Sequence, residues 1–292
     1  MSERRLRDLR RWHERAYREM ASAGERRVAY LGLDLLVPST VFGPTPTSDL
    51  LGQAVTAETD PTDRVLDMGT GSGVNAILAA RQGAEVVGVD LNPTAVDAAR
   101  LNAERNDVRA LFKVSDIYSA VDGTFDLMII DPPFRWFTPR DMTEAAATDE
   151  GYRGVARFFA GVDQRLRPGG RILLFFGTSG DQEHVVGLAE RSGLRPQVVA
   201  SRDLTQDDVT VTYSTFRLER ADSLSEDLSQ PRGRAGVAGP RRRRRRLDLI
   251  EADSADSWTR ASGASRSEPL CVLGLRWLGS TGDDRQSVRH PI

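Results

Sequence analysis

The chain has 292 residues, of which 39% are hydrophobic, a formal net charge of −2 and a single cysteine, Cys271. This composition can support one sizeable core, and a net charge so close to zero gives no overall preference for a polyanion such as nucleic acid. One cysteine excludes an intrachain disulfide, and neither a signal peptide nor an 18-residue apolar run is found, so the sequence predicts a cytoplasmic enzyme with no membrane span.

Residues 1–36 are predicted to form an N-terminal amphipathic helix and a lead-in strand. Residues 1–27 are rich in arginine. Apolar or aromatic residues recur there at three- or four-residue steps: Leu6, Leu9, His13, Tyr17 and Met20. This spacing indicates a helix docked on the core, with RNA contact or a cover over a cleft as alternatives. Residues 28–42 show apolar alternation and are predicted to be extended.

Residues 37–220 are predicted to form one α/β domain. Short apolar runs bounded by turns indicate five strands: Val65–Met68, Val86–Val89, Ala110–Val114, Leu127–Ile130 and Ile172–Phe176. Helical patterns precede or separate them: Asp49–Thr59, Val74–Arg81, Pro93–Asn106, Gly151–Leu166 and Gln182–Ser192. This alternation predicts a parallel sheet with helices on both faces. Two further strands, Pro196–Ser201 and Val209–Arg217, follow without a helix between them and predict an antiparallel hairpin at the sheet edge.

Residues 221–292 are predicted to be a disordered tail. Ser, Asp, Arg and Gly dominate residues 221–268, which include six consecutive arginines at Arg241–Arg246. Such a composition cannot bury enough apolar surface to fold alone. The arginines could bind RNA, and a poorly constrained extension is the alternative.

A glycine-rich turn follows the first core strand. Gly69, Gly71 and Gly73 lie between a predicted strand and a predicted helix. Glycine lets the backbone approach a ligand closely, and the N–H groups at a helix start favour a polar or anionic group. A dinucleotide fold would need its third glycine at position 74, which is Val74.

Acidic residues follow three successive strands. Asp67 precedes the glycine turn, Asp90 ends the second strand and Asp116 follows the third. An acid in the second position can accept both hydroxyls of a ribose. Each residue alone could be a helix cap or a loop acid, but three acids at successive strand ends favour a nucleoside-binding site.

The fourth strand ends in Asp131-Pro132-Pro133-Phe134. The Asp131 side chain and the Pro132 carbonyl can accept both hydrogens of a planar NH2 group, which aims the nitrogen lone pair at an electrophile. The two prolines fix φ, and Phe134 can stack on a planar acceptor. A buried strand ending in a Pro-Pro turn is the alternative interpretation.

Taken together, these motifs resemble those of class I S-adenosylmethionine (SAM)-dependent methyltransferases. Asp67-x-Gly69-x-Gly71-x-Gly73 is similar to the cofactor motif of these enzymes, and Asp131–Phe134 resembles the [Asn/Asp]-Pro-Pro-aromatic motif of N-methyltransferases. The resemblance extends from about Val37 to Glu219 and is closest to the HemK-like, methyltransferase small domain group. It implies a Rossmann-like, seven-stranded sheet, mostly parallel, with a C-terminal antiparallel hairpin.

The resemblance also implies residue roles. Asp67 would hold the ammonium group of SAM, Asp90 its ribose and Asp116 its adenine amino group, with Ile117 against the ring. Thr47 and Ser48, in a segment that packs over the cofactor, would lie near it. The full set of implied cofactor residues is Asp67, Gly69, Thr70, Gly71, Gly73, Asp90, Leu91, Asn92, Asp116 and Ile117. The implied catalytic set is Asp131, Pro132, Pro133 and Phe134.

The implied activity is methyl transfer to a planar nitrogen, with a release-factor-type protein glutamine or a nucleobase amine as acceptor. Enzymes of the glutamine type present Asn where this chain has Asp131, and they carry a longer N-terminal helical domain. Both differences leave an RNA or DNA base open as the acceptor. The partner is therefore expected to be protein or RNA, and the sequence does not reveal the oligomeric state.

Two other functions are compatible with parts of the sequence. An NAD-dependent oxidoreductase would use the glycine turn, but Val74 and the closing hairpin argue against it. A non-catalytic SAM- or RNA-binding protein would use Arg241–Arg246, but an intact Asp131–Phe134 motif argues against lost catalysis. No metal site is expected, because the three histidines are scattered and there is one cysteine.

Overall fold

The structure, a computed structural model, describes residues 3–206, 209–220 and 250–251. The strands are β1 Arg26–Tyr30, β2 Leu33–Val37, β3 Arg64–Met68, β4 Glu85–Asp90, β5 Leu111–Val114, β6 Phe125–Ile130, β7 Leu166–Gly177, β8 Leu194–Gln206, β9 Val209–Arg220 and β10 Ile250–Glu251. The helices are α1 Glu3–Ser22, α2 Asp49–Glu58, α3 Val74–Arg81, α4 Pro93–Arg105, α5 Met142–Ala145, η1 Glu150–Tyr152, α6 Arg153–Arg165 and α7 Gln182–Arg191.

The main sheet has the strand order β8-β9-β7-β6-β3-β4-β5, with the two-residue β10 beside β8. Neighbouring strands from β5 to β7 pair in parallel, whereas β9 is antiparallel to both β7 and β8. The predicted fold class, a mostly parallel seven-stranded sheet with a C-terminal antiparallel hairpin, is confirmed. Within this hairpin β9 lies between β7 and β8, so the earlier strand β8 is the outer one of the two.

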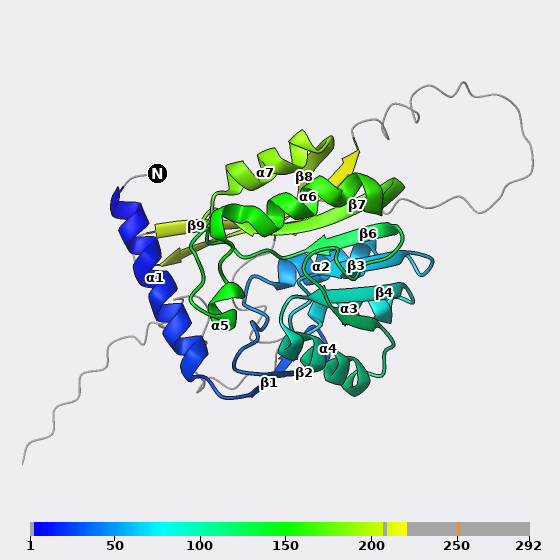
Figure 1. The fold of residues 1–292 in the computed structure, drawn as a ribbon, viewed down its shortest axis with the longest axis horizontal. Coiled ribbons are helices and arrows are strands. Elements are labelled where there is room, and N and C mark those ends of the chain that lie inside the picture. The colour runs from blue at the N-terminus through cyan, green and yellow to red at the C-terminus, as the bar shows by residue number, and fades with distance from the viewer. Residues whose placement is uncertain (1–2, 207–208, 221–249, 252–292) are drawn as a thin grey trace, which may run out of the picture.

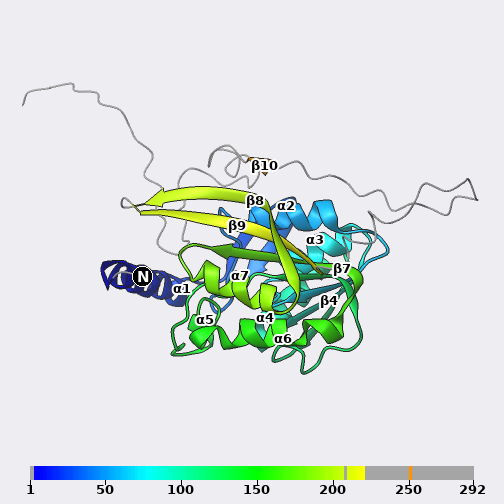
Figure 2. The same cartoon turned by 90° about the horizontal axis from the view of Figure 1, so that it is seen from above.

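Helices cover both faces of the sheet. Figure 2 shows α2 and α3 on one face and α6 and α7 on the other. The strands between them are buried along nearly their whole length, and residues such as Leu66, Leu127, Ile129 and Leu173 are fully excluded from solvent. A strand that is covered on both faces has a nearly continuous run of apolar residues. For this reason the predicted ranges of the central strands are close to the observed ones.

The N-terminal segment that the sequence presents as one extended stretch is a β-hairpin. β1 and β2 pair antiparallel through a two-residue turn at Leu31 and Gly32, which have φ values of 46° and 75°. Such a turn needs positive φ at both positions, and leucine rarely adopts it. The unusual residue at the first turn position is the reason that the turn is hard to recognise in the sequence.

Helix α1 lies beside the segment that follows β6, as Figure 1 shows for α1 and α5. Leu9, His13, Ala16 and Met20 are its buried residues. The predicted amphipathic helix is therefore present, with a docked face close to the expected one. No helix in the described ranges is both long enough and apolar enough to cross a bilayer.

Of the predicted tail, the structure describes Ile250–Glu251, which pair in parallel with Ala200 and Ser201 of β8. The arginine run Arg241–Arg246 and all other residues of 221–292 lie outside the described residues.

Candidate active site

A cavity of about 530 Å³ lies at the carboxyl ends of the central strands. Its walls come from the loops after β3, β4, β5 and β6, from the segment before α2 and from residues that precede α6. The carboxyl ends of strands where a parallel sheet changes its winding direction are where α/β folds bind ligands, and pockets of this size hold ligands as large as drugs.

The glycine turn forms one wall of the cavity. Gly69, Gly71 and Gly73 all have positive φ values, 73°, 53° and 87°. Gly69 and Thr70 both donate a backbone hydrogen bond to the Val89 carbonyl, at 2.9 Å. A Cβ on Gly73 would lie 3.0 Å from Ala99 of α4. The turn thus depends on glycine both for its backbone conformation and for the close packing of α3 against α4.

Asp67 stabilises this turn from inside the protein. Its Oδ2 accepts hydrogen bonds from Thr70 Oγ1 at 2.6 Å and from the Ala76 backbone at 3.1 Å. Burial, partly offset by these bonds, raises the pKa of Asp67 to about 6. Asp67 and Gly73 do not line the cavity, unlike the other predicted cofactor residues. In this structure Asp67 acts on the turn, and the predicted contact with a ligand ammonium group stays a prediction.

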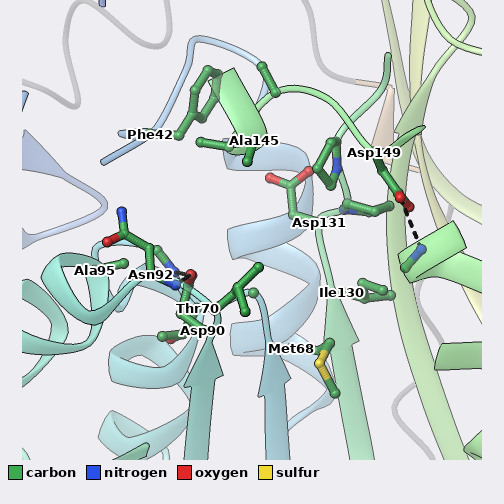
Figure 3. A pocket seen from close by; sticks show the side chains of 18 of the residues that line it. Phe42, Met68, Thr70, Asp90, Asn92, Ala95, Ile130, Asp131, Ala145 and Asp149 are labelled. Atoms are coloured by element: carbon green, nitrogen blue, oxygen red, sulfur yellow. Dashed lines mark hydrogen bonds between the residues drawn. The ribbon is translucent and has the colours of Figure 1, made fainter. Parts of the chain in front are cut away.

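Asp90 joins the glycine turn to the next loop. Its two carboxylate oxygens accept hydrogen bonds from the Gly71 and Asn92 backbones, each at 2.9 Å. Asn92 caps α4 through Thr94 and donates from Nδ2 to the Thr40 carbonyl at 3.2 Å. A carboxylate has about four lone-pair sites, so Asp90 can still accept a hydrogen bond from a ligand at the cavity wall, as the predicted role toward ribose hydroxyls requires. Figure 3 shows Thr70, Asp90 and Asn92 together on this side.

The residues predicted to contact the adenine of the cofactor line one part of the cavity, and their role toward adenine stays a prediction. Leu91 lines the cavity and is 52% exposed, and Ile117 lines it with a φ of 52°. These two apolar side chains provide a surface for a flat ring. The Asp116 carboxylate forms an ion pair with Arg157 at 2.9 Å, and both side chains are half exposed. Asp116 is thus in place, although its proposed bond to an adenine amino group would compete with Arg157.

Asp131 points its carboxyl group into the cavity (Figure 3). No hydrogen bond from a described residue reaches this group, whereas Asp67 and Asp90 each accept two or more. Burial, with a smaller effect from the charge of Asp67, raises the pKa of Asp131 to about 7. A partly buried carboxylate without a donor is unfavourable, so this group favours a ligand that brings N–H groups or positive charge.

The Pro-Pro-aromatic part of the motif also lines the cavity. Phe134 is 9% exposed, and its ring packs against Phe175, Phe176 and Tyr213 at centroid distances of 5.8, 4.8 and 6.1 Å. Tyr152 donates a hydrogen bond to the Phe134 carbonyl at 2.9 Å. The backbone after β6 is therefore held firmly, and the aromatic ring has only a small surface available for stacking.

The segment before α2 forms the opposite wall. In Figure 3, Phe42 and Ala145 lie across the cavity from Thr70 and Met68. Thr47 and Ser48 line the cavity, and their predicted position near the cofactor stays a prediction. Arg202 of β8 holds this segment, because it binds both Asp49 oxygens at 2.9 Å and the Pro46 carbonyl at 2.9 Å.

Several cavity residues belong to none of the motifs found in the sequence. Arg135, Phe175 and Tyr213 belong to this group. The irregular segment after β6, held by α1, adds a further wall: Pro139, Met142, Ala145, Ala146, Ala147, Thr148, Asp149 and Glu150. Their position depends on tertiary contacts, and only the Arg-Trp-Phe run directly after the motif could have drawn attention to Arg135. Within the described ranges, no three His, Cys, Asp or Glu side chains are grouped closely enough to hold a metal ion.

The geometry can be compared with known proteins. The profile of the family described as Methyltransferase small domain matches residues 43–191, just over half of the chain. The chain is 36% identical over 169 residues to the ribosomal protein L11 methyltransferase of Ralstonia pickettii, covering 56% of this chain and 45% of that protein. It is 34% identical over 194 residues to the release factor glutamine methyltransferase of Rhodospirillum rubrum, covering 60% and 58%. The chain thus spans about half the length of these curated relatives.

Solved structures agree with the fold. The structure of SMU.776 complexed with SAH has a TM-score of 0.51 and 14% identity, covering 67% of this chain and 56% of that chain. The chain belongs to the methyltransferase small domain family of class I methyltransferases, whose cofactor is SAM.

Proposed function

We propose that this chain transfers a methyl group from SAM to the side-chain amide nitrogen of a protein glutamine. One observation carries the proposal: the Asp131 carboxyl group has no hydrogen-bond donor among the residues that the structure describes, and it lies in the same cavity as the glycine turn and Asp90. The positive charge of a nucleoside ligand on one side, and the N–H donors of a planar NH2 group on the other, would stabilise the negative charge of the acids that line the cavity.

The acceptor end of the cavity would position the amide nitrogen, and no separate base would be needed to activate it. The Asp131 carboxylate and the Pro132 carbonyl would accept the two amide hydrogens and so direct the nitrogen lone pair toward the methyl group. SAM, when bound, supplies an electrophilic methyl on a positively charged sulfur. Much of the rate would come from this orientation, because the prolines and the Tyr152 hydrogen bond to Phe134 keep the backbone in place.

Two features support the glutamine acceptor. The release factor glutamine methyltransferase of Rhodospirillum rubrum aligns over 194 residues of this chain. The cavity wall after β6 includes three small residues, Ala145, Ala146 and Ala147, and small side chains there take up less of the space that an extended glutamine side chain would need. We place such a reaction in the cytoplasm, where translation factors reside.

A nucleobase exocyclic amine is the second candidate acceptor. Asp131 favours it, because the glutamine enzymes that the sequence resembles carry Asn there, while Asp occurs in several nucleic-acid amine methyltransferases. Both acceptors present the same planar NH2 group, so the chemistry at Asp131 is shared.

The test uses the purified full chain and methyl-labelled SAM in a cell extract that is afterwards divided in two. Label that resists RNase and is released by protease supports the glutamine acceptor. Label that resists protease and is released by RNase assigns the nucleobase. Absence of label, with SAM still bound, would contradict both acceptors.

Asp131→Ala supplies the matched test of the site. We expect turnover to be lost while SAM affinity, measured by calorimetry, is kept, since Asp131 faces the acceptor. Asp122→Ala is the control, because the Asp122 side chain is 91% exposed in the connection between β5 and β6. Normal turnover by Asp131→Ala would show that the acceptor assignment is wrong.

A further inference from the structure

Arg135 follows the acceptor motif directly and is buried, with 3% of its surface exposed. Both of its side-chain hydrogen bonds leave from Nη1, to the Ser179 carbonyl at 2.7 Å and to Ser179 Oγ at 3.0 Å. Nε is buried and finds no acceptor among the described residues. The Nε–Nη2 edge of the guanidinium, which can hold two parallel hydrogen bonds, is therefore available.

The other two buried arginines of the described chain are neutralised by carboxylates. Arg171 binds Glu58 at 3.2 Å and Asp63 at 2.7 Å. Arg202 binds Asp49 through two hydrogen bonds at 2.9 Å. No ion pair joins Arg135 to an acid in the described ranges. A buried charge without a partner costs several kcal/mol, so its presence here needs an explanation.

The location of Arg135 supplies one. It lines the acceptor end of the cavity together with Phe134, Phe175 and Tyr213. The other arginines of the cavity wall are already paired, Arg153 with Glu150 and Arg157 with Asp116. Burial lowers the pKa of Arg135, and the nearby hydroxyl groups of Tyr152 and Tyr213 oppose this effect. The site is thus a single unpaired cation in a largely aromatic corner.

We propose that Arg135 is a subsite for a carboxylate carried by the methyl acceptor, bound side-on through Nε and Nη2. This rests on the proposed function in that the acceptor amide occupies Asp131. A planar carboxylate matches the two parallel donors, and its size suits a corner that exposes little of the guanidinium. The acceptor would then be an acidic segment, with a carboxylate near the methylated amide, and Arg135 would determine specificity.

The test measures anion binding without methyl transfer. The full chain, loaded with S-adenosylhomocysteine, is titrated with acetate or with acetamide, a neutral molecule of the same shape. The readout is the Nε–H resonance of Arg135 in a ¹H–¹⁵N spectrum, assigned by its loss in Arg135→Lys. We expect acetate to shift this resonance and to bind at least about tenfold more tightly than acetamide, the range for hydrogen bonds to a charged group.

Two variants test whether the acetate preference depends on Arg135. Because Arg135→Gln lacks the reporting Nε–H, the variants are followed through the backbone amide resonances of the residues around the cavity. Arg135→Gln should reduce the preference for acetate over acetamide to within about twofold. Arg153→Gln, which changes a cavity arginine that already has a partner, should retain the preference. Equal binding of acetate and acetamide to the wild-type protein would overturn the proposal. That outcome leaves the labelling experiment on extracts unaffected, so failure of the subsite and failure of the proposed function are distinguishable.

Two further outcomes would also overturn the carboxylate assignment. The first is a shift of the Arg135 resonance by inorganic phosphate with none by acetate, which would point to a phosphate-bearing acceptor. The second is a tenfold loss of S-adenosylhomocysteine affinity in Arg135→Gln, which would assign the arginine to the carboxylate of the cofactor. A variant that loses its fold is recognised by its melting curve, and the wild-type titration then decides alone.

Discussion

His13 of α1 and Glu144 of α5 form a buried hydrogen bond, with Nε2 and Oε1 separated by 2.7 Å across 131 residues of sequence. Burial outweighs the attraction of Glu144 and lowers the pKa of His13. The ring is therefore neutral at neutral pH, with its proton on Nε2, and it donates to the carboxylate. Arg140 binds the same carboxylate at 2.9 Å. This contact attaches the N-terminal helix to the wall of the cavity.

Glu144→Gln should loosen that attachment. The substitution keeps the shape but removes the charge that accepts from His13 and Arg140, so we expect the free energy of α1 opening to fall by about 2 kcal/mol. Hydrogen exchange of the α1 amides measures this directly. The KM for the acceptor should rise with kcat less affected, because Ala145 to Thr148 line the cavity. Glu183→Gln, an exposed acid on α7, is the control, and unchanged exchange in Glu144→Gln would contradict the prediction.

Acid should weaken the same contact in two steps. His13 has a folded pKa below its usual 6.5, so the unfolded or undocked chain binds more protons and docking weakens as pH falls through 6.5. Burial would raise the pKa of Glu144, but bonds from Arg140 and His13 outweigh it and lower the pKa to about 2. Its contribution is present above pH 4.5 and is lost as pH falls toward 2. Exchange rates of α1, corrected for intrinsic rates, should show the first step between pH 7.5 and 5.5, and His13→Gln should lack it.

Methyl transfer should depend on the ionisation of Asp131. Its carboxyl group accepts an amide hydrogen best when it is charged, while the Pro132 carbonyl accepts the other hydrogen, and burial raises the pKa of Asp131 to about 7. We therefore expect kcat/KM for SAM, which reports the free enzyme, to rise with pH up to and through about 7. Asp131→Asn has no such titration and should give a flat profile. A wild-type profile that is flat from pH 6 to 8 would show that the protonation state of Asp131 does not limit the reaction.

Asp90→Ala should weaken SAM binding as its main effect. The carboxylate organises the Gly71 and Asn92 backbones and offers its remaining lone pairs to the cavity. Loss of two charge-assisted hydrogen bonds predicts an increase in Kd of about a hundredfold by calorimetry. Asp97→Ala is matched to it, because Asp97 is an exposed acid of α4 that pairs with Arg100. Equal affinities for the two variants would exclude Asp90 from the cofactor site.

Arg202→Met should destabilise the whole domain. The change leaves the buried Asp49 carboxylate without its bidentate partner and releases the Pro46 carbonyl. Breaking one side of a buried ion pair costs about 3–5 kcal/mol. Urea unfolding should show a corresponding decrease in midpoint at constant m-value. The double variant with Asp49→Leu should recover part of this loss, and its failure to do so would indicate that lost packing dominates.

The sequence locates the parts of the fold that depend on local signals. Strands β3, β4 and β6 and helix α3 lie within two residues of the predicted ranges, because buried parallel strands form continuous apolar runs and the glycine turn marks the start of the helix. The β1–β2 turn escapes recognition because Leu31 adopts a conformation that leucine rarely takes. The start of β7 at Leu166 is also missed, since Pro168 and the two following glycines resemble a turn.

The candidate site is predictable only where a motif carries it. The glycine turn, Asp90 and Asp131 follow strand ends, and their convergence at one edge of the sheet is a consequence of parallel topology. The pairing of Asp116 with Arg157, 41 residues apart, has no local signature. The same is true of Arg135, whose lack of an acidic partner is a property of the packed interior and not of the sequence around it.

Asn102 of α4 is fully buried and forms the backbone hydrogen bonds with β2 that a neighbouring strand would otherwise form. Its amide accepts from the Leu36 N–H at 2.7 Å and donates to the Leu36 carbonyl and the Ser72 carbonyl, each at 2.9 Å. Asn106, one turn later, bonds Asp34 in the same way. This edge of the hairpin is therefore closed to self-association. Because one side chain ties the hairpin to the glycine turn, order in the cofactor loop and order at the N-terminus are thermodynamically linked, and binding at one should be detectable at the other.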